Sequence, residues 1–138
     1  GASYGWARLM KRPWPTRAMY SYAIQRAKNL EAATIKVENI NGPVLVPGGG
    51  LDGVGPADEM ALQIIGRLKA KGHPHDDLAL TYADAGHQIV NPYSSTTINY
   101  LTAPDGFMEL LGGTPSANAQ ASKDSGPKII EFLAKALR

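Results

Sequence analysis

The apolar positions of the chain recur with a helical period in two places. Between residues 56 and 72 they repeat every three or four positions, the spacing of one buried helix face. The members of this stripe are Met60, Ala61, Ile64, Ile65 and Leu68. Pro56 precedes the stripe and Gly72 follows it, and both residue types are common at helix ends. The pattern predicts one helix over residues 56–71 and, from a similar repeat, another over residues 127–137.

A weaker helical pattern follows Thr16, a residue type that often caps the N-terminus of a helix. It reaches about Ala33, and the spacing of its apolar side chains predicts an amphipathic helix over residues 16–33. Residues 1–15 contain two Trp and two Pro without a clear period. We expect this first stretch to be irregular.

Two short apolar runs predict strands. The first, residues 44–46, lies between a Gly-Pro pair and three consecutive glycines, and the second is residues 78–82. Such runs are typical of buried strands in parallel sheets, and a helix between two of them is the usual crossover. The order therefore predicts an α/β fold with a small parallel sheet. Residues 91–125, rich in Ser, Thr, Asn, Gly and Pro, are expected to form a long loop with a short helix at residues 107–111.

Composition is that of one domain. The chain has 138 residues, too few for two ordinary domains. It has no Cys, which excludes disulfides, thiolate metal sites and a Cys nucleophile. The net charge of +2 is too small to indicate nucleic-acid binding, and no apolar run is long enough to cross a bilayer. We therefore expect a cytoplasmic protein that binds neither nucleic acid nor membrane.

Two polar residues follow the predicted strands. Asp52 comes just after the first strand, and His87 lies in the loop after the second. In open α/β sheets, catalytic groups gather beyond the carboxyl ends of the strands. An acid followed by a His is also the order of the last two members of an α/β-hydrolase triad, in which the acid orients the His and the His moves the proton. The alternative is structural, because Asp is a common turn residue and a lone loop His is often solvated.

Two further motifs are weaker indications of a functional site. His73-Pro74-His75 followed by Asp76 and Asp77 has metal-ligating residue types. The same stretch fits a loop that leaves a helix and is stiffened by Pro, so we expect no metal there. The three glycines at residues 48–50 lack the Lys of a phosphate-binding loop and are interpreted as a turn.

Ordered blocks along the chain resemble one family. They are GPVLV at residues 42–46, GLD at 50–52, RLKAKGHPH at 67–75, YADAGH at 82–87, GGTP at 112–115, KDS at 123–125 and IIEFL at 129–133. Together they are similar to the C-terminal domain of the acyl-CoA thioesterases and bile acid-CoA:amino acid N-acyltransferases, over about residues 35–137. The chain departs from this pattern at Gly55 and Gly126, where the family usually has Trp.

The resemblance implies a truncated α/β-hydrolase fold, with three layers and a small parallel sheet, that hydrolyses or transfers an acyl group held as an ester or acyl-CoA thioester. Asp52 falls on the family's catalytic acid and His87 on its catalytic histidine, and no metal or other cofactor is required. We expect residues 1–34 to form a basic N-terminal segment with a helix, and residues 35–138 the C-terminal part of an α/β-hydrolase domain. The basic segment is interpreted as a solvated helix face, the alternatives being a rim for CoA phosphates and an RNA-stacking surface.

The nucleophile is less clear from the sequence. Gly1-Ala2-Ser3-Tyr4-Gly5 spells the G-x-S-x-G of a hydrolase nucleophile elbow, and Ser3 would then complete a triad with Asp52 and His87. No strand is predicted ahead of Ser3, however. An accidental match, with the nucleophile on a missing segment or a partner chain, is the other interpretation.

The predicted function is therefore a Ser-His-Asp hydrolase of the acyl-CoA thioesterase or esterase type. The alternative is a non-catalytic remnant that acts through an exposed sheet edge. A sheet of two or three strands leaves an edge unpaired, so we expect either a homo-oligomer or a missing N-terminal segment to cover it. The first residue, Gly1, is not Met, which favours an excerpt of a longer protein.

Overall fold

The structure is a computed structural model that describes residues 2–89 and 92–138, with the side chains of residues 2 and 3 left out. Its helices and strands in chain order are α1 (Ala2–Leu9), α2 (Arg17–Arg26), α3 (Leu30–Ala33), the 3-10 helix η1 (Val37–Asn39), β1 (Leu45–Gly49), α4 (Ala57–Ala70), β2 (Leu78–Tyr82), β3 (Tyr100–Thr102), β4 (Met108–Leu110) and α5 (Pro115–Ala136).

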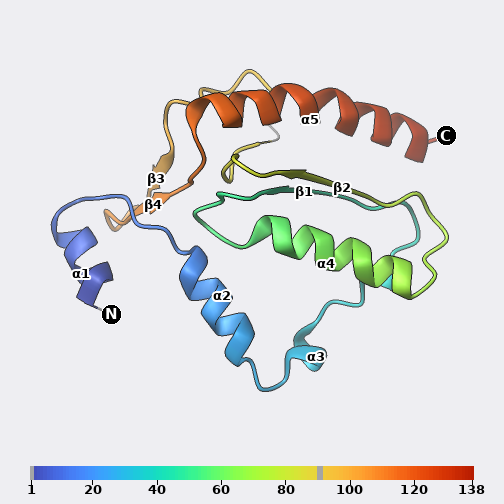
Figure 1. Ribbon diagram of the computed structural model, residues 1–138, viewed down its shortest axis with the longest axis horizontal. Helices are drawn as coiled ribbons and strands as arrows, with labels where there is room; N and C mark the ends of the chain where they lie inside the picture. Colours follow the sequence, from blue (N-terminus) through green and yellow to red (C-terminus); the bar gives the residue numbers. More distant parts are fainter. Residues whose placement is uncertain (1, 90–91) are drawn as a thin grey trace.

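The centre of the fold is a parallel pair of strands, β1 and β2. Leu45 pairs with Leu78 at one end and Gly49 with Tyr82 at the other. The crossover helix α4 packs against both strands, and α5 lies on the opposite face of the sheet (Figure 1). The chain is thus a three-layer α/β/α unit with a small parallel sheet, which confirms the predicted fold class.

The buried core is small and lies on both faces of this sheet. On one side Ala61 and Leu68 of α4 are fully buried, and on the other Ala85, Ile89 and Ala121 form a cluster. The predicted α4 and β2 are both present. Helix α4 could be predicted because a clear periodicity lies between Pro56 and Gly72, and β2 because a short apolar run is followed by a glycine-containing loop.

One edge of β1 has no partner strand in the part of the chain that the structure describes. The backbone groups of Val44 and Gly50 both bond to β2 or the residues next to it. Along a strand, the backbone N–H and C=O groups of successive residues point to opposite edges. The backbone groups that point to the free edge are therefore those of Leu45, Pro47 and Gly49. β1 runs further than predicted and includes Pro47, which offers no N–H to that edge.

The first 34 residues differ from the sequence prediction. Residues 1–15 are not all irregular, because α1 forms and is joined to the β3–β4 hairpin by an ion pair of 3.1 Å between Arg8 and Asp105. The helix predicted over residues 16–33 is divided into α2 and α3, and neither helix has a buried residue. A helix whose apolar side chains find no packing surface gains little beyond its intrinsic propensity, which accounts for the early end of α2.

Residues 107–111, predicted as a short helix, contain strand β4 instead. This strand pairs antiparallel with β3. In the turn between them, the Ala103 N–H donates to Phe107 O at 2.8 Å, and Gly106 has a φ of +81°. A run of five residues is too short for its period to distinguish a strand from a helix.

The last helix, α5, begins well before the predicted start and passes through Pro127. Thr114 caps it by accepting a hydrogen bond from the Ala117 N–H at 3.2 Å. Three polar residues of its first half, Asn118, Ser122 and Ser125, are buried rather than loop-forming. The Ser125 hydroxyl, for example, donates to Ile89 O at 2.6 Å. Tertiary contacts therefore override the turn-like composition. Within the described residues, neither α5 nor any shorter helix has the length and apolar character to span a membrane.

Candidate functional site

Asp52 lies in the turn that follows β1 and is buried, with 2% of its surface exposed. Its Oδ1 accepts hydrogen bonds from the N–H groups of Val54 at 2.7 Å and Gly55 at 3.2 Å. Its Oδ2 lies 2.9 Å from Nδ1 of His87. Three donors around a buried carboxylate stabilise its ionised form. The turn therefore fixes the carboxylate and directs one oxygen at His87.

The pKa values of these two residues shift in opposite directions. Burial raises the pKa of Asp52, but the hydrogen bonds from His87 and from two backbone N–H groups outweigh burial and bring the pKa below the ordinary 3.8. The hydrogen bond to Asp52 raises the pKa of His87 above the ordinary 6.5, although burial opposes it. The carboxylate and the imidazolium thus stabilise each other.

His87 lies in the loop after β2, where its backbone N–H donates to Leu111 O at 2.9 Å. An ionised carboxylate can only accept hydrogen bonds, so the proton of a neutral His87 ring resides on Nδ1 and Nε2 carries the free lone pair. The side chain is 48% exposed, in contrast to buried Asp52. This tautomer on a solvent-accessible ring is what a general base requires.

A third segment, residues 111–114, joins the two loops that carry this dyad. The Gly53 N–H donates to Leu111 O, and the Gly113 N–H donates to Leu51 O, both at 3.1 Å. The sequence predicted the two dyad side chains and the contact between them but missed this segment. Its signal in the sequence is the pair of glycines ahead of a helix cap.

Thr16, predicted as an N-cap, occupies that position of α2, but its hydroxyl does not cap the helix. Instead Oγ1 lies 2.7 Å from Oε1 of Glu109 and 3.0 Å from the Val54 carbonyl oxygen. Val54 belongs to the turn that holds Asp52. The buried Thr16 therefore attaches the N-terminal segment to the dyad turn, which its local sequence does not indicate.

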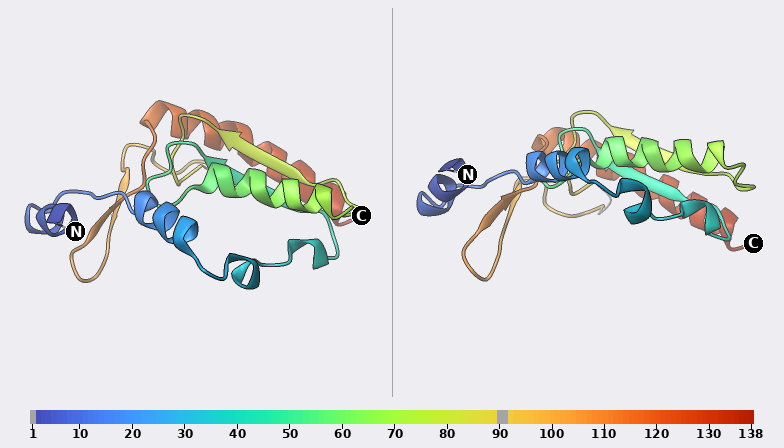
Figure 2. Two further views of the ribbon diagram at one scale, coloured as in Figure 1. Left: turned by 60° about the horizontal axis from the view of Figure 1, so that its bottom comes forward. Right: turned by 90° about the horizontal axis from the view of Figure 1, so that it is seen from below.

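Ser3, the predicted nucleophile, belongs to α1, and its side chain lies outside the described residues. Helix α1 contacts the β3–β4 hairpin, where the Tyr4 and Phe107 ring centroids are 5.5 Å apart. Figure 1 and both views of Figure 2 show α1 beyond that hairpin, away from the ends of β1 and β2. The structure brings Asp52 and His87 together but does not bring α1 against them, and Ser3 as nucleophile stays a prediction.

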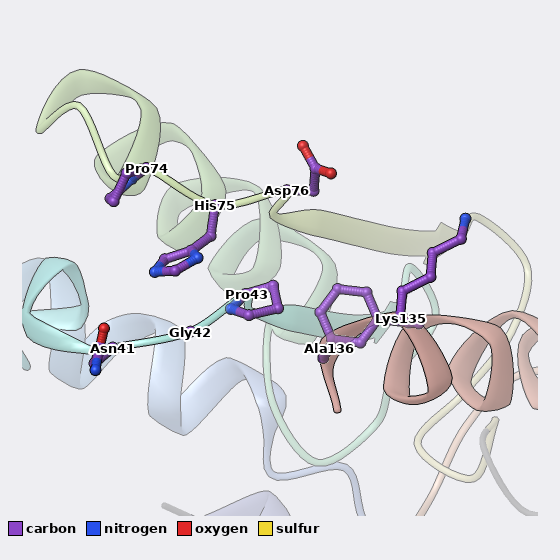
Figure 3. Close-up of a pocket in the computed structure, with 9 residues that line it drawn as sticks. Asn41, Gly42, Pro43, Pro74, His75, Asp76, Lys135 and Ala136 are labelled. Atoms are coloured by element: carbon purple, nitrogen blue, oxygen red, sulfur yellow. The ribbon is translucent and has the colours of Figure 1, made fainter. Parts of the chain in front are cut away.

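A pocket of about 500 Å³ lies at the opposite end of the sheet from the dyad (Figure 3). His75 and Asp76, which precede β2, line it. Neighbouring His73 is engaged within the protein, with Nδ1 2.7 Å from Asp77 Oδ2 and Nε2 2.8 Å from Ile40 O. Across residues 2–89 and 92–138, no three metal-ligating side chains gather into a group that could hold an ion.

Comparison with known protein families matches residues 15–138 to the family described as BAAT / acyl-CoA thioester hydrolase C terminal. A comparison with curated proteins finds no match. The family match includes the turn of Asp52, the loop of His87 and the segment at residues 111–114. It begins at residue 15, within the basic N-terminal segment. The chain therefore belongs to the BAAT / acyl-CoA thioester hydrolase C-terminal family.

Proposed function

We propose that this chain hydrolyses acyl-CoA thioesters, or transfers their acyl groups, with Asp52 orienting His87 as a general base. The observation that carries the proposal is the 2.9 Å contact between His87 Nδ1 and the buried Asp52 carboxylate. That contact leaves Nε2 of a half-exposed ring as the proton acceptor. The family description, which names acyl-CoA thioester hydrolases, supplies the substrate class.

In the proposed reaction, Nε2 of His87 accepts the proton of a Ser hydroxyl while the Ser oxygen attacks the thioester carbonyl carbon. Asp52 stabilises the imidazolium that forms. The imidazolium then gives its proton to the sulfur as the carbon–sulfur bond breaks, which releases the CoA thiol and leaves an acyl-Ser. Water or an amine, deprotonated by His87, attacks the acyl-Ser in turn, and the Ser oxygen leaves with that proton.

The nucleophile in this proposal is a Ser, with Ser3 as the candidate within this chain. Its support is the G-x-S-x-G spacing. The position of α1 beyond the hairpin means that Ser3 would reach His87 only after α1 moves, or from a second copy of the chain. A Ser on a segment outside this chain is the other source of the nucleophile.

The proposal is tested by hydrolysis of p-nitrophenyl acetate and of a short acyl-CoA. We expect His87→Gln and Asp52→Asn to reduce kcat by roughly a thousandfold or more, because both act in the same proton transfer. His75→Gln, at the far end of the sheet, is the matched control and should leave the rate unchanged. Ser3→Ala should cause a comparable loss of kcat if Ser3 is the nucleophile. An unchanged rate in this variant would exclude Ser3 as the nucleophile.

Wild-type protein without activity, folded and with the dyad intact, would contradict the enzyme proposal. It would favour the second candidate, a non-catalytic member of the family that acts through the free edge of β1. The observation that favours this candidate is the row of backbone groups at Leu45, Pro47 and Gly49 that no described strand pairs. We propose a second copy of this chain as the occupant of that edge in either case.

A further inference from the structure

Asn118 is a buried polar residue next to the dyad loops. It lies near the start of α5, and 4% of its surface is exposed. Its Oδ1 accepts a hydrogen bond from the Gly86 N–H at 2.7 Å, and its Nδ2 donates to Gly112 O at 3.2 Å. Both halves of the side-chain amide are therefore bonded to backbone groups outside α5, and one of these groups, at Gly86, is 32 residues away in the sequence.

The two partners of Asn118 stand beside the two dyad residues. Gly86 directly precedes His87 in the chain, and Gly112 forms an antiparallel bridge with Asp52. One side chain thus holds the backbone on both sides of the contact between Asp52 and His87. The loop of His87 is further limited by its N–H bond to Leu111 O.

The backbone segments around this amide are closely packed. A Cβ on Gly113 would collide with Asn118 Oδ1 and with the Gly86 nitrogen, and a Cβ on Gly86 would collide with Gly112 O. The amide presents an acceptor and a donor on separate atoms, whereas a carboxylate lacks the donor and an alkyl group lacks both. A change at Asn118 would leave buried backbone groups unpaired and let the loops separate.

We propose that Asn118 is a positioning residue, which holds the loop of His87 against the turn of Asp52 and so sets the hydrogen bond between the two side chains. The effect of Asn118 on catalysis rests on the proposed function, but its effect on the geometry of the Asp52–His87 contact does not. Asn118 itself touches neither dyad side chain in the described hydrogen bonds.

The test uses the full chain and NMR titration of its three His rings, assigned with His87→Gln. In Asn118→Leu, we expect the pKa of His87 to fall toward its ordinary 6.5, because the hydrogen bond to Asp52 is the main cause of its raised value. His73, held by Asp77 at the other end of the sheet, should titrate as in the wild type. The matched control is Gln120→Leu, which replaces an exposed amide on the same helix.

Amide hydrogen exchange of Gly86 provides a second measurement, and its first step uses the wild-type chain alone. If Asn118 holds this group, the Gly86 N–H exchanges slowly in the wild type, and Asn118→Ser speeds its exchange more than that of the β2 amides. A Gly86 amide that exchanges as fast as an unprotected one in the wild type would overturn the proposal, even if Asn118→Leu does not fold. So would a folded Asn118→Leu in which His87 titrates unchanged.

An activity measurement then tests whether the position of His87 set by Asn118 affects the reaction. With an active wild type, Asn118→Leu should lower kcat by roughly tenfold to a hundredfold and move the pH midpoint of the rate with the pKa of His87, as expected for a displaced base. An unchanged rate and midpoint would overturn the positioning role. An inactive wild type would reject the proposed function alone, because the NMR and exchange measurements still decide the role of Asn118.

Discussion

Gly113 meets two constraints at the junction of the dyad loops. Its φ of +70° lies in the left-handed region that residues with a Cβ rarely adopt. Its missing side chain also leaves the space that Asn118 Oδ1 and the Gly86 nitrogen occupy. Backbone conformation and close approach therefore both require Gly here, and the dyad geometry depends on it.

This reasoning predicts the effect of Gly113→Ala against a matched control. Gly106 has a φ of +81° but open space where a Cβ would stand. Gly106→Ala should therefore cost only the backbone strain, about 1–2 kcal/mol of unfolding free energy. Gly113→Ala should cost at least about 2 kcal/mol more, because a buried collision is added. Urea unfolding measures both values, and equal losses in the two variants would contradict the close-contact argument.

At the residue scale, the sequence is informative where a role follows from local position. Asp52 and His87 could be predicted because each follows a recognisable strand, and parallel strands bring their carboxyl ends to one edge. Asn118 could not, because its partner Gly86 is 32 residues away and its signal is a single Asn in a stretch with loop-like composition. Thr16 shows the same limit, since its hydroxyl serves a distant turn and not its own helix.

Between the C-terminal end of α4 and β2, His73 joins two loops at the amino ends of the strands. Its side chain is 1% exposed, and its two nitrogens face the Asp77 carboxylate and the Ile40 carbonyl oxygen. Both partners are acceptors, so the arrangement is satisfied only when both nitrogens carry protons. The bond to Ile40 O, and then that to Asp77, raise the pKa of His73 above the ordinary 6.5. Asp77 also accepts from the Val44 N–H at 2.9 Å.

The raised pKa predicts how stability depends on pH. The folded state binds the His73 proton more tightly than the unfolded chain does, so this contribution is fully present below about pH 6.5 and is lost as the pH rises through the folded-state pKa. His87 adds a contribution of the same sign. Urea unfolding between about pH 6 and about pH 9 should therefore show a smaller decrease in His73→Gln than in the wild type. A His73→Gln slope equal to the wild type would reject the argument.

The elements differ in how far the sequence predicts them. Helix α4 shows a regular stripe with boundary residues, and this stripe packs against the sheet through the fully buried Ala61 and Leu68, although Met60, predicted as part of it, is exposed. The α2 segment shows a comparable but weaker pattern without a surface to pack on, so its predicted length is wrong. In α5, buried Asn and Ser side chains bond to backbone groups of the dyad loops and the residues after them, and a helix forms where composition favours a loop. Periodicity therefore predicts an element best when its burial is local and uniform.

The accessible surface of the whole molecule is larger than that of a typical compact monomer of the same mass. Its accessible surface is 9362 Å², whereas a compact monomer of 14.7 kDa exposes about 6,900 Å². The difference, about 2,400 Å², is large compared with the roughly 800 Å² that each partner buries in a standard interface. Exposed apolar side chains on α1, α2 and α5, such as Trp6, Tyr22 and Leu133, contribute to it. The fold thus offers a surface that association would bury.

We therefore expect this chain to self-associate through the free edge of β1, with more than roughly 1,000 Å² buried in total. Light scattering at micromolar concentration should show a dimer or larger species. Leu45→Pro removes one of the two N–H groups that the free edge still offers, at Leu45 and Gly49, and should shift the equilibrium toward monomer. Leu133→Ser, on the exposed face of α5, is the control and should leave the mass unchanged.

If Leu133→Ser alone produces monomer, a helix face rather than the sheet edge makes the interface. A cooperatively folded wild-type monomer would reject self-association and leave a segment outside this chain as the occupant of the edge.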